Sequence, residues 1–351
     1  MKVLKNVNLY GEITDITVEN GKITKIGKTA ENGVDFGGNK IYPGLIDIHI
    51  HGCIGDDTMD ANLERMNDWL LSMGTTSWCP TTMSESEENI IRATSARVDF
   101  GKGANIIGFH LEGPFINKEC KGAMNEKYII PPSRELFDKC KRVARITVAP
   151  EIEGNMEFIK DCPVQVSIGH TKADYDTASE AFRCGATSLT HTYNVMPGIH
   201  HRAPGPIGAC SDNENVFAEL IADGIHIHPS AIRIILKVFG TDRIVLISDA
   251  MRAAGLPDGE YDLGGQMMTV KNSVARTKDG NLAGSTVTLF ECVKRIISFG
   301  VKESEAIKMA SENPARLLGL NKGKIEVGYD ADFIIVDDGF NLVKAIARGE
   351  F

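Results

Sequence analysis

The sequence predicts an α/β fold, a TIM-like (β/α)8 barrel joined to a small β-sandwich domain that both chain termini form. Strand-like and helix-like segments alternate through the middle of the chain, and both ends read as short strands separated by turns. The length of 351 residues suits one barrel of about 250 residues with an accessory domain. These observations predict one large and one small unit.

The two ends of the chain carry the predicted small domain. Short strands and Gly-containing turns run through residues 1–40, and residues 323–336 have the same character. Neither segment is long enough to bury a core alone, so we expect the two to pair. The predicted domains are residues 1–43 plus 323–351 for the β domain and residues 44–322 for the barrel.

The middle of the chain contains apolar segments of strand length, typical of parallel strands buried on both faces. An open doubly wound sheet is the competing fold, but no Gly-x-Gly-x-x-Gly motif follows the first strand. We expect a hairpin near residues 255–284, inserted after the eighth strand. The strands are expected near residues 45–51, 75–79, 106–110, 145–148, 164–168, 187–191, 216–221 and 244–247.

Composition excludes several classes of function. The net charge of −9 and the lack of a basic run argue against a nucleic-acid partner. No apolar run is long enough for a signal peptide or a membrane span, so we expect a cytoplasmic protein with no membrane partner. The eight cysteines form no Cys-x-x-Cys pair, so buried free thiols are expected rather than a zinc ribbon or disulfide framework.

Histidines and carboxylates follow five of the predicted barrel strands. A His-x-His pair on the first strand points to one side, because side chains alternate along a strand. Such a pair alone is weak evidence for a metal, and a lone polar residue at a strand end is equally well explained by a hydrogen bond. Their joint occurrence at the C-terminal end of a barrel indicates a cation site. The candidate ligands are His49, His51, Glu112, His170, His191 and Asp249.

Imidazole nitrogens combined with a carboxylate suit a divalent transition metal, with zinc as the first choice and iron or manganese as alternatives. Such an ion lowers the pKa of a bound water and polarises a carbonyl oxygen, so hydrolysis is the expected reaction. Asp249, on the last strand, is the candidate that accepts the water proton and returns it to a leaving nitrogen. His110 is expected to form a hydrogen bond inside the barrel rather than to bind metal.

Nine short motifs along the chain carry a family resemblance. They are PGLIDIHIHG at 43–52, HLEGPFIN at 110–117, KGA at 121–123, GHT at 169–171, THTYNVM at 190–196, RAPG at 202–205, ADGIH at 222–226, SDAM at 248–251 and LAGS at 282–285. On these motifs the chain resembles the N-acetylglucosamine-6-phosphate deacetylases of the amidohydrolase superfamily along nearly its whole length. The Glu-Gly-Pro and Ala-Asp-Gly-x-His signatures are more specific than His-x-His.

The resemblance implies hydrolysis of N-acetylglucosamine 6-phosphate to glucosamine 6-phosphate and acetate in amino-sugar catabolism. It implies one or two ions per subunit, the main one on Glu112, His170 and His191, with Glu112 bridging to a second ion on His49 and His51. Asp249 matches the acid/base. The resemblance also implies a homodimer in which a pair of phosphate-binding residues comes from the neighbouring subunit. The residues implied to bind the sugar phosphate are Ala123, Met124, Asn194, Val195, Arg202, Asp223, Gly224, Ile225, His226, Leu282, Ala283 and Gly284.

Met124 departs from the family pattern, because some members have there a histidine that helps to polarise the acetyl carbonyl. Carbonyl activation then depends more heavily on the metal, or the acyl and sugar preferences differ. His200 and His201 are candidate substitutes, although adjacent loop histidines are more often exposed. Two alternatives stay open: a deacetylase of another N-acyl amino sugar, such as N-acetylgalactosamine 6-phosphate, and a catalytically silent metal-binding relative.

Overall fold

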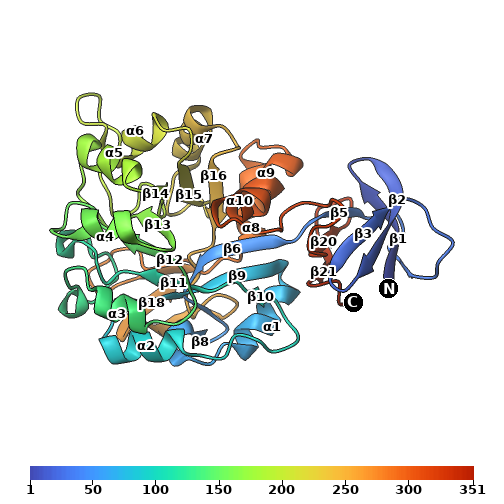
Figure 1. Cartoon of the computed structure of the whole chain (residues 1–351), viewed down its shortest axis with the longest axis horizontal. Helices are drawn as coiled ribbons and strands as arrows, with labels where there is room; N and C mark the ends of the chain where they lie inside the picture. The colour runs from blue at the N-terminus through green and yellow to red at the C-terminus, as the bar shows by residue number, and fades with distance from the viewer.

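A barrel of eight parallel strands forms the larger part of the molecule (Figure 1). The computed structural model describes residues 1–351. The barrel strands are β6 (Leu45–Ile50), β9 (Thr75–Thr82), β11 (Phe109–Glu112), β12 (Val143–Val148), β13 (Gln165–Ile168), β14 (Ala186–Leu189), β15 (Phe217–Ile221) and β16 (Ile244–Ile247). Each strand pairs in parallel with the next. The backbone N–H of Asp249 donates to the carbonyl of His49 at 2.9 Å and joins the last strand to the first.

Helices follow the barrel strands and cover the outside of the barrel (Figure 1). Side chains cap the ends of these helices. Asp174 accepts the backbone N–H of Thr177 at the start of α5 (Tyr175–Arg183), and Thr288 and Glu291 form a capping box at the start of α8 (Leu289–Ser298). The helices are η1 (Thr58–Asp60), α1 (Glu64–Ser72), α2 (Glu87–Thr94), η2 (Lys118–Cys120), η3 (Glu126–Tyr128), α3 (Arg134–Lys139), α4 (Asn155–Asp161), α5 (Tyr175–Arg183), α6 (Gly205–Ser211), α7 (Pro229–Phe239), α8 (Leu289–Ser298), α9 (Glu303–Ala310) and α10 (Glu312–Leu317). None of these helices is long and apolar enough to cross a membrane.

The two chain ends build a separate sheet beside the barrel (Figure 1). Its strands are β1 (Lys2–Leu9), β2 (Glu12–Glu19), β3 (Lys22–Ile26), β4 (Val34–Asp35), β5 (Lys40–Pro43), β20 (Phe333–Val336) and β21 (Leu342–Ile346). β5 pairs antiparallel with β20, which joins the two ends, and buried side chains from both, such as Leu4 and Phe333, share one core cluster. The predicted fold class, a barrel with a small β domain from both termini, is confirmed. The predicted residue boundaries of the two domains stay a prediction.

The segment after β16 forms a small antiparallel sheet where the sequence predicted a hairpin. Its strands are β17 (Gly259–Leu263), β18 (Gln266–Lys271) and β19 (Val274–Arg276). Gly264 and Gly265 connect β17 to β18 with φ angles of +57° and +75°, which suit the tight turn of a hairpin. Three two-residue strands complete the structure: β7 (Gly52–Cys53), β8 (Asp56–Asp57) and β10 (Asn105–Ile106).

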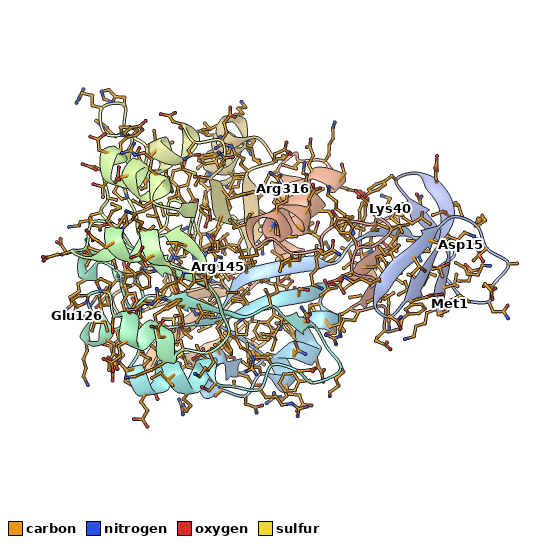
Figure 2. The ribbon with its side chains drawn as sticks, in the orientation of Figure 1. Met1, Asp15, Lys40, Glu126, Arg145 and Arg316 are labelled. Carbon is orange, nitrogen blue, oxygen red and sulfur yellow. The ribbon has the colours of Figure 1, made fainter.

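A buried ion pair of Arg145 and Glu219 lies inside the barrel. Figure 2 shows Arg145 in the middle of the barrel. Its guanidinium also donates to the carbonyl of Ile48 at 3.1 Å, directly before His49, and the hydroxyl of Ser188 donates to Glu219 at 2.6 Å. A buried charge without its partner is costly, so this pair depends on both members. The pair therefore supports the strand that carries the first histidines.

Candidate active site

The candidate metal ligands gather at the C-terminal end of the barrel, where the loops after the strands meet. Three of them have left-handed backbone: φ is +50° at His170, +29° at His191 and +48° at Asp249. This conformation is rare for residues other than glycine and costs of order 1–3 kcal/mol each, so surrounding structure must hold it. Such strain concentrates at functional sites.

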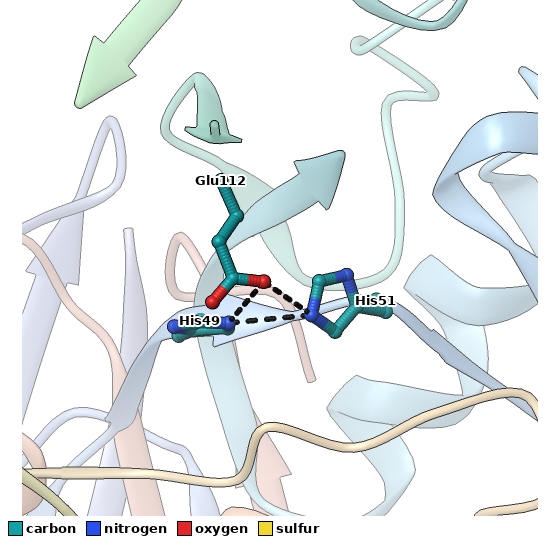
Figure 3. A group of neighbouring side chains, drawn as sticks. All are labelled: His49, His51 and Glu112. Carbon is teal, nitrogen blue, oxygen red and sulfur yellow. Dashed lines mark hydrogen bonds and ion pairs between the residues drawn. The ribbon is translucent and has the colours of Figure 1, made fainter. Parts of the chain in front are cut away.

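The first ligand group consists of His49, His51 and Glu112, which converge at one point (Figure 3). The Nε2 atoms of the two histidines are 3.3 Å apart. Glu112 Oε2 lies 3.4 Å from the Nε2 of His49 and 3.0 Å from that of His51. Asp249 joins this group, because its Oδ1 lies 3.2 Å and 3.3 Å from the same two nitrogens.

The second ligand group consists of Glu112, His170 and His191. Glu112 Oε1 lies 3.1 Å from the Nε2 of His170 and 2.8 Å from that of His191, and these nitrogens are 3.2 Å apart. The two oxygens of one carboxylate therefore face two different pairs of imidazoles. The structure brings all six predicted residues together. Their assignment as metal ligands stays a prediction.

Hydrogen bonds behind two of the four imidazoles fit a metal site, whereas the buried Nδ1 atoms of His49 and His191 have no partner. The Nδ1 of His51 lies 3.2 Å from the carbonyl of Thr81, and the Nδ1 of His170 lies 2.8 Å from the carbonyl of Cys120. A carbonyl only accepts, so each Nδ1 carries a proton, and Nε2 is the atom left to bind a cation. Such orientation from behind is typical of metal-binding histidines. The donor set of nitrogens and carboxylate oxygens therefore fits one or two divalent cations.

The charges of the first ligand group depend on one another. Burial alone would lower the pKa of His49, but the carboxylates of Glu112 and Asp249 outweigh burial and raise that pKa to about 9. Burial likewise opposes protonation of His51, yet the same carboxylates raise its pKa to about 10. Burial would raise the pKa of Asp249, whereas His49 and His51 hold it well below its usual range. Protons on the histidines thus balance the buried carboxylates, and a cation would replace them.

His110 lies beneath the ligands and is held neutral. Burial lowers its pKa well below the usual value, and the positive charge of Arg145 lowers it further. Its Nε2 is 2.8 Å from the hydroxyl of Thr147, and its ring packs edge-on against His49 with centroids 4.6 Å apart. His110 therefore supports a ligand ring from inside the barrel and is in neither ligand group.

A cavity of about 470 Å³ lies above the ligands. Several predicted substrate residues line it: Ala123, Met124, Asn194, Val195, His226, Leu282 and Gly284. Other predicted residues are not among its lining: Arg202, Asp223, Gly224, Ile225 and Ala283. Arg202 is exposed, with His200 and His201 exposed beside it. These two histidines therefore do not take the place of the family histidine within this chain.

The sequence did not single out six further lining residues: Met83, Glu119, Lys121, Gly122, Leu263 and Asn281. Lys121 and Gly122 belong to the KGA motif, and Asn281 precedes LAGS, so neighbouring motifs could have indicated them. Met83 and Leu263 are apolar residues outside any motif. No local signal in the sequence marks them.

Asp223 acts on the cavity through His226. Its Oδ2 lies 2.7 Å from the Nδ1 of His226, and its Oδ1 accepts backbone N–H groups of Ile225 and His226 at 2.8 Å each. Burial would lower the pKa of His226, but Asp223 outweighs it and raises that pKa above its usual value. His226 therefore lines the cavity as an imidazole that is more readily protonated than usual.

Comparisons with known proteins agree with this geometry. The model of the Amidohydrolase family matches residues 41–351. The chain is 40% identical to N-acetylglucosamine-6-phosphate deacetylase of Bacillus subtilis over 330 residues, 88% of this chain and 83% of the relative. It is 36% identical to N-acetylgalactosamine-6-phosphate deacetylase of Escherichia coli O157:H7, over 88% of this chain and 87% of the relative. The crystal structure of N-acetylglucosamine-6-phosphate deacetylase from Thermotoga maritima superposes with a TM-score of 0.92 at 34% identity, covering 99% of this chain and 98% of that one. The chain therefore belongs to the amidohydrolase family, whose members are metal-dependent hydrolases.

Proposed function

We propose that this protein hydrolyses the acetyl group of N-acetylglucosamine 6-phosphate and releases glucosamine 6-phosphate and acetate. The observation that carries the proposal is the shared carboxylate of Glu112, whose two oxygens face two histidine pairs beside Asp249. The cavity above them contains His226, whose pKa Asp223 raises against the effect of burial, and a protonated imidazole there suits a phosphorylated substrate. The similarity to named deacetylases supports the same choice.

We assign the two ligand groups to one or two divalent ions, with zinc as the first choice and iron or manganese as alternatives. Glu112, His170 and His191 would hold the main ion, and His49 and His51, with Asp249, a second. A bound ion would polarise the amide carbonyl and acidify a water molecule. The buried setting strengthens these electrostatic effects.

Asp249 moves the proton in the proposed reaction. Burial alone would raise its pKa, but His49 and His51 hold that pKa well below the usual range, so the carboxylate is ionised. Water adds to the carbonyl carbon, its proton passes to Asp249, and the C–N bond breaks as Asp249 returns this proton to the nitrogen. The remaining proton of the water leaves the new carboxyl group for the amine, so the products are acetate and the protonated amine.

The phosphate end of the substrate is assigned to His226, positioned by Asp223. Asn194, Val195 and Leu282 would contact the sugar, since they line the same cavity. Arg202 is exposed and outside this cavity, which suits a role across a subunit interface. We therefore propose a homodimer in which Arg202 of one subunit reaches the phosphate bound by the other.

The expected cytoplasmic location stays a prediction.

A second candidate substrate is N-acetylgalactosamine 6-phosphate. The similarity to a deacetylase of that name, at 36% identity, favours it as an alternative. Comparing kcat/KM for the two epimers with the metal-loaded protein decides between them. We expect the gluco epimer to be preferred, whereas a strong preference for the galacto epimer would overturn the substrate assignment. A metal-loaded protein inert towards both would instead support a catalytically silent relative.

A further inference from the structure

Gln266 connects the inserted sheet to the loop that lines the cavity. Its side-chain Nε2 donates to the carbonyl of Ala123 at 2.6 Å, across 143 positions of sequence. Gln266 begins β18 and faces Leu263, the last residue of β17, across the two-glycine turn. The bond therefore attaches the tip of this hairpin directly to the residue before Met124.

Three apolar side chains beside this bond form one wall of the cavity. Met83, Met124 and Leu263 are all buried and all line the cavity, and we call them the apolar wall. The sulfur of Met124 accepts the backbone N–H of Ser84 at 3.2 Å. The turn packs tightly on Met83, because a Cβ added at Gly264 would lie 3.1 Å from the Cβ of Met83. Methionine side chains are flexible, so the shape of this wall depends on the backbone that holds it.

Two members of the apolar wall follow barrel strands distant from the strand that precedes His226. Met83 follows β9, the second barrel strand, and Met124 follows β11, the third, whereas His226 follows β15, the seventh. Leu263 belongs to the sheet inserted after β16, the eighth. If the phosphate contacts His226 and the amide lies at the ligands, we expect the acyl group to extend towards Met83 and Met124, which line the same cavity. The apolar wall is thus suited to the methyl group of an acetyl substituent.

We propose that Gln266 is a positioning residue that holds the apolar wall in place and thereby limits the size of the acyl group accepted. This inference rests on the proposed deacetylase function. Without the bond to Ala123, the hairpin tip and the loop of Met124 can separate, and the wall recedes. A longer acyl chain would then fit better than it does in the native enzyme.

The test compares kcat/KM for the N-acetyl and N-propionyl forms of glucosamine 6-phosphate. Gln266→Glu keeps the size of the side chain but replaces the donor by an oxygen that repels the Ala123 carbonyl, and Gln266→Leu removes the bond without adding charge. We expect the acetyl-over-propionyl preference to fall roughly three- to tenfold in both, the range that corresponds to one hydrogen bond. Thr269→Val is the matched control, because its hydroxyl bonds Glu260 at 2.8 Å on the exposed side of the same hairpin. It should keep the native preference.

An unchanged acyl preference in folded Gln266→Glu and Gln266→Leu proteins overturns the inference. A loss of overall activity without a change in preference overturns it equally, because a merely structural role predicts that result. If both variants fail to fold, Gln266→Asn is used instead, because it keeps the amide but shortens the side chain by one methylene. The ratio of kcat/KM for the acetyl and propionyl substrates is then measured for this variant. A native enzyme that releases no acetate would instead contradict the proposed function, so the two failures are distinguishable.

Discussion

Replacement of Asp249 by asparagine interrupts the proposed proton path with little disturbance of the fold. Asp249 has φ of +48°, and asparagine is one of the few residues that readily adopt left-handed backbone. The amide has nearly the same size and shape as the carboxylate, but it cannot accept the proton of water. An alanine at this position would add backbone strain and would confuse the two effects.

The structure sets the expected size of this effect. A positioned acid–base group contributes about 10²- to 10⁴-fold, so kcat should fall by that factor, which corresponds to about 3–5 kcal/mol in the barrier. KM should change little, because His226 and Asn194 line the cavity and their hydrogen bonds are to Asp223 and His191 rather than to Asp249. Glu112, His170 and His191 still form a complete ligand group, so metal should stay bound there.

Acetate release measured at several substrate concentrations, with metal content determined on the same sample, provides the assay. Asp212→Asn is a matched control, because Asp212 is exposed and bonds the hydroxyl of Tyr175 at 2.9 Å. It should keep native kcat and KM. Near-native turnover of metal-loaded Asp249→Asn would show that another group moves the proton, and would refute the reasoning.

Three further predictions follow from the structure. Glu112→Gln should lose metal from both ligand groups, because one carboxylate faces both; native metal content measured by mass spectrometry would contradict this. Arg145→Met should lower the free energy of unfolding in urea by about 3–5 kcal/mol, because it leaves Glu219 buried without a partner, whereas the exposed Arg65→Met should cost less than about 1 kcal/mol. An equal decrease in the free energy of unfolding for Arg145→Met and Arg65→Met would contradict the proposed role of the buried pair. KM for the phosphorylated substrate should rise as pH rises through the raised pKa of His226, because the imidazolium loses its charge, and Asp223→Asn should move this rise to lower pH. A pH profile of KM that is the same with and without the Asp223 carboxylate would argue against the pair.

Much of the fold was predictable because strand periodicity and strand-end chemistry are local properties. His49 and His51 alternate along one strand, and apolar segments mark its neighbours, so the barrel and its active end follow from the sequence. The prediction that Glu112 belongs to both ligand groups rests on the family resemblance. Alternation and composition do not reveal which carboxylate oxygen faces which histidine.

The features that the sequence did not predict depend on contacts between residues far apart in the chain. Arg145 and Glu219 lie in segments that read as apolar strands, although a charge within such a strand is itself a signal that an opposite charge lies nearby. The bond from Gln266 to Ala123 joins positions 143 residues apart, and neither residue type predicts it. The left-handed turn at His170 likewise arises from packing, because histidine does not require it.

In the proposed reaction, the two histidine pairs around Glu112 hold the divalent metal that deacetylation requires. The direct measurement is metal content coupled to acetate release from N-acetylglucosamine 6-phosphate, before and after treatment with a chelator and again after zinc is restored. We predict one or two ions per subunit in the native protein, loss of acetate release with loss of metal, and recovery of both together. Full acetate release from protein that contains no metal would contradict the claim.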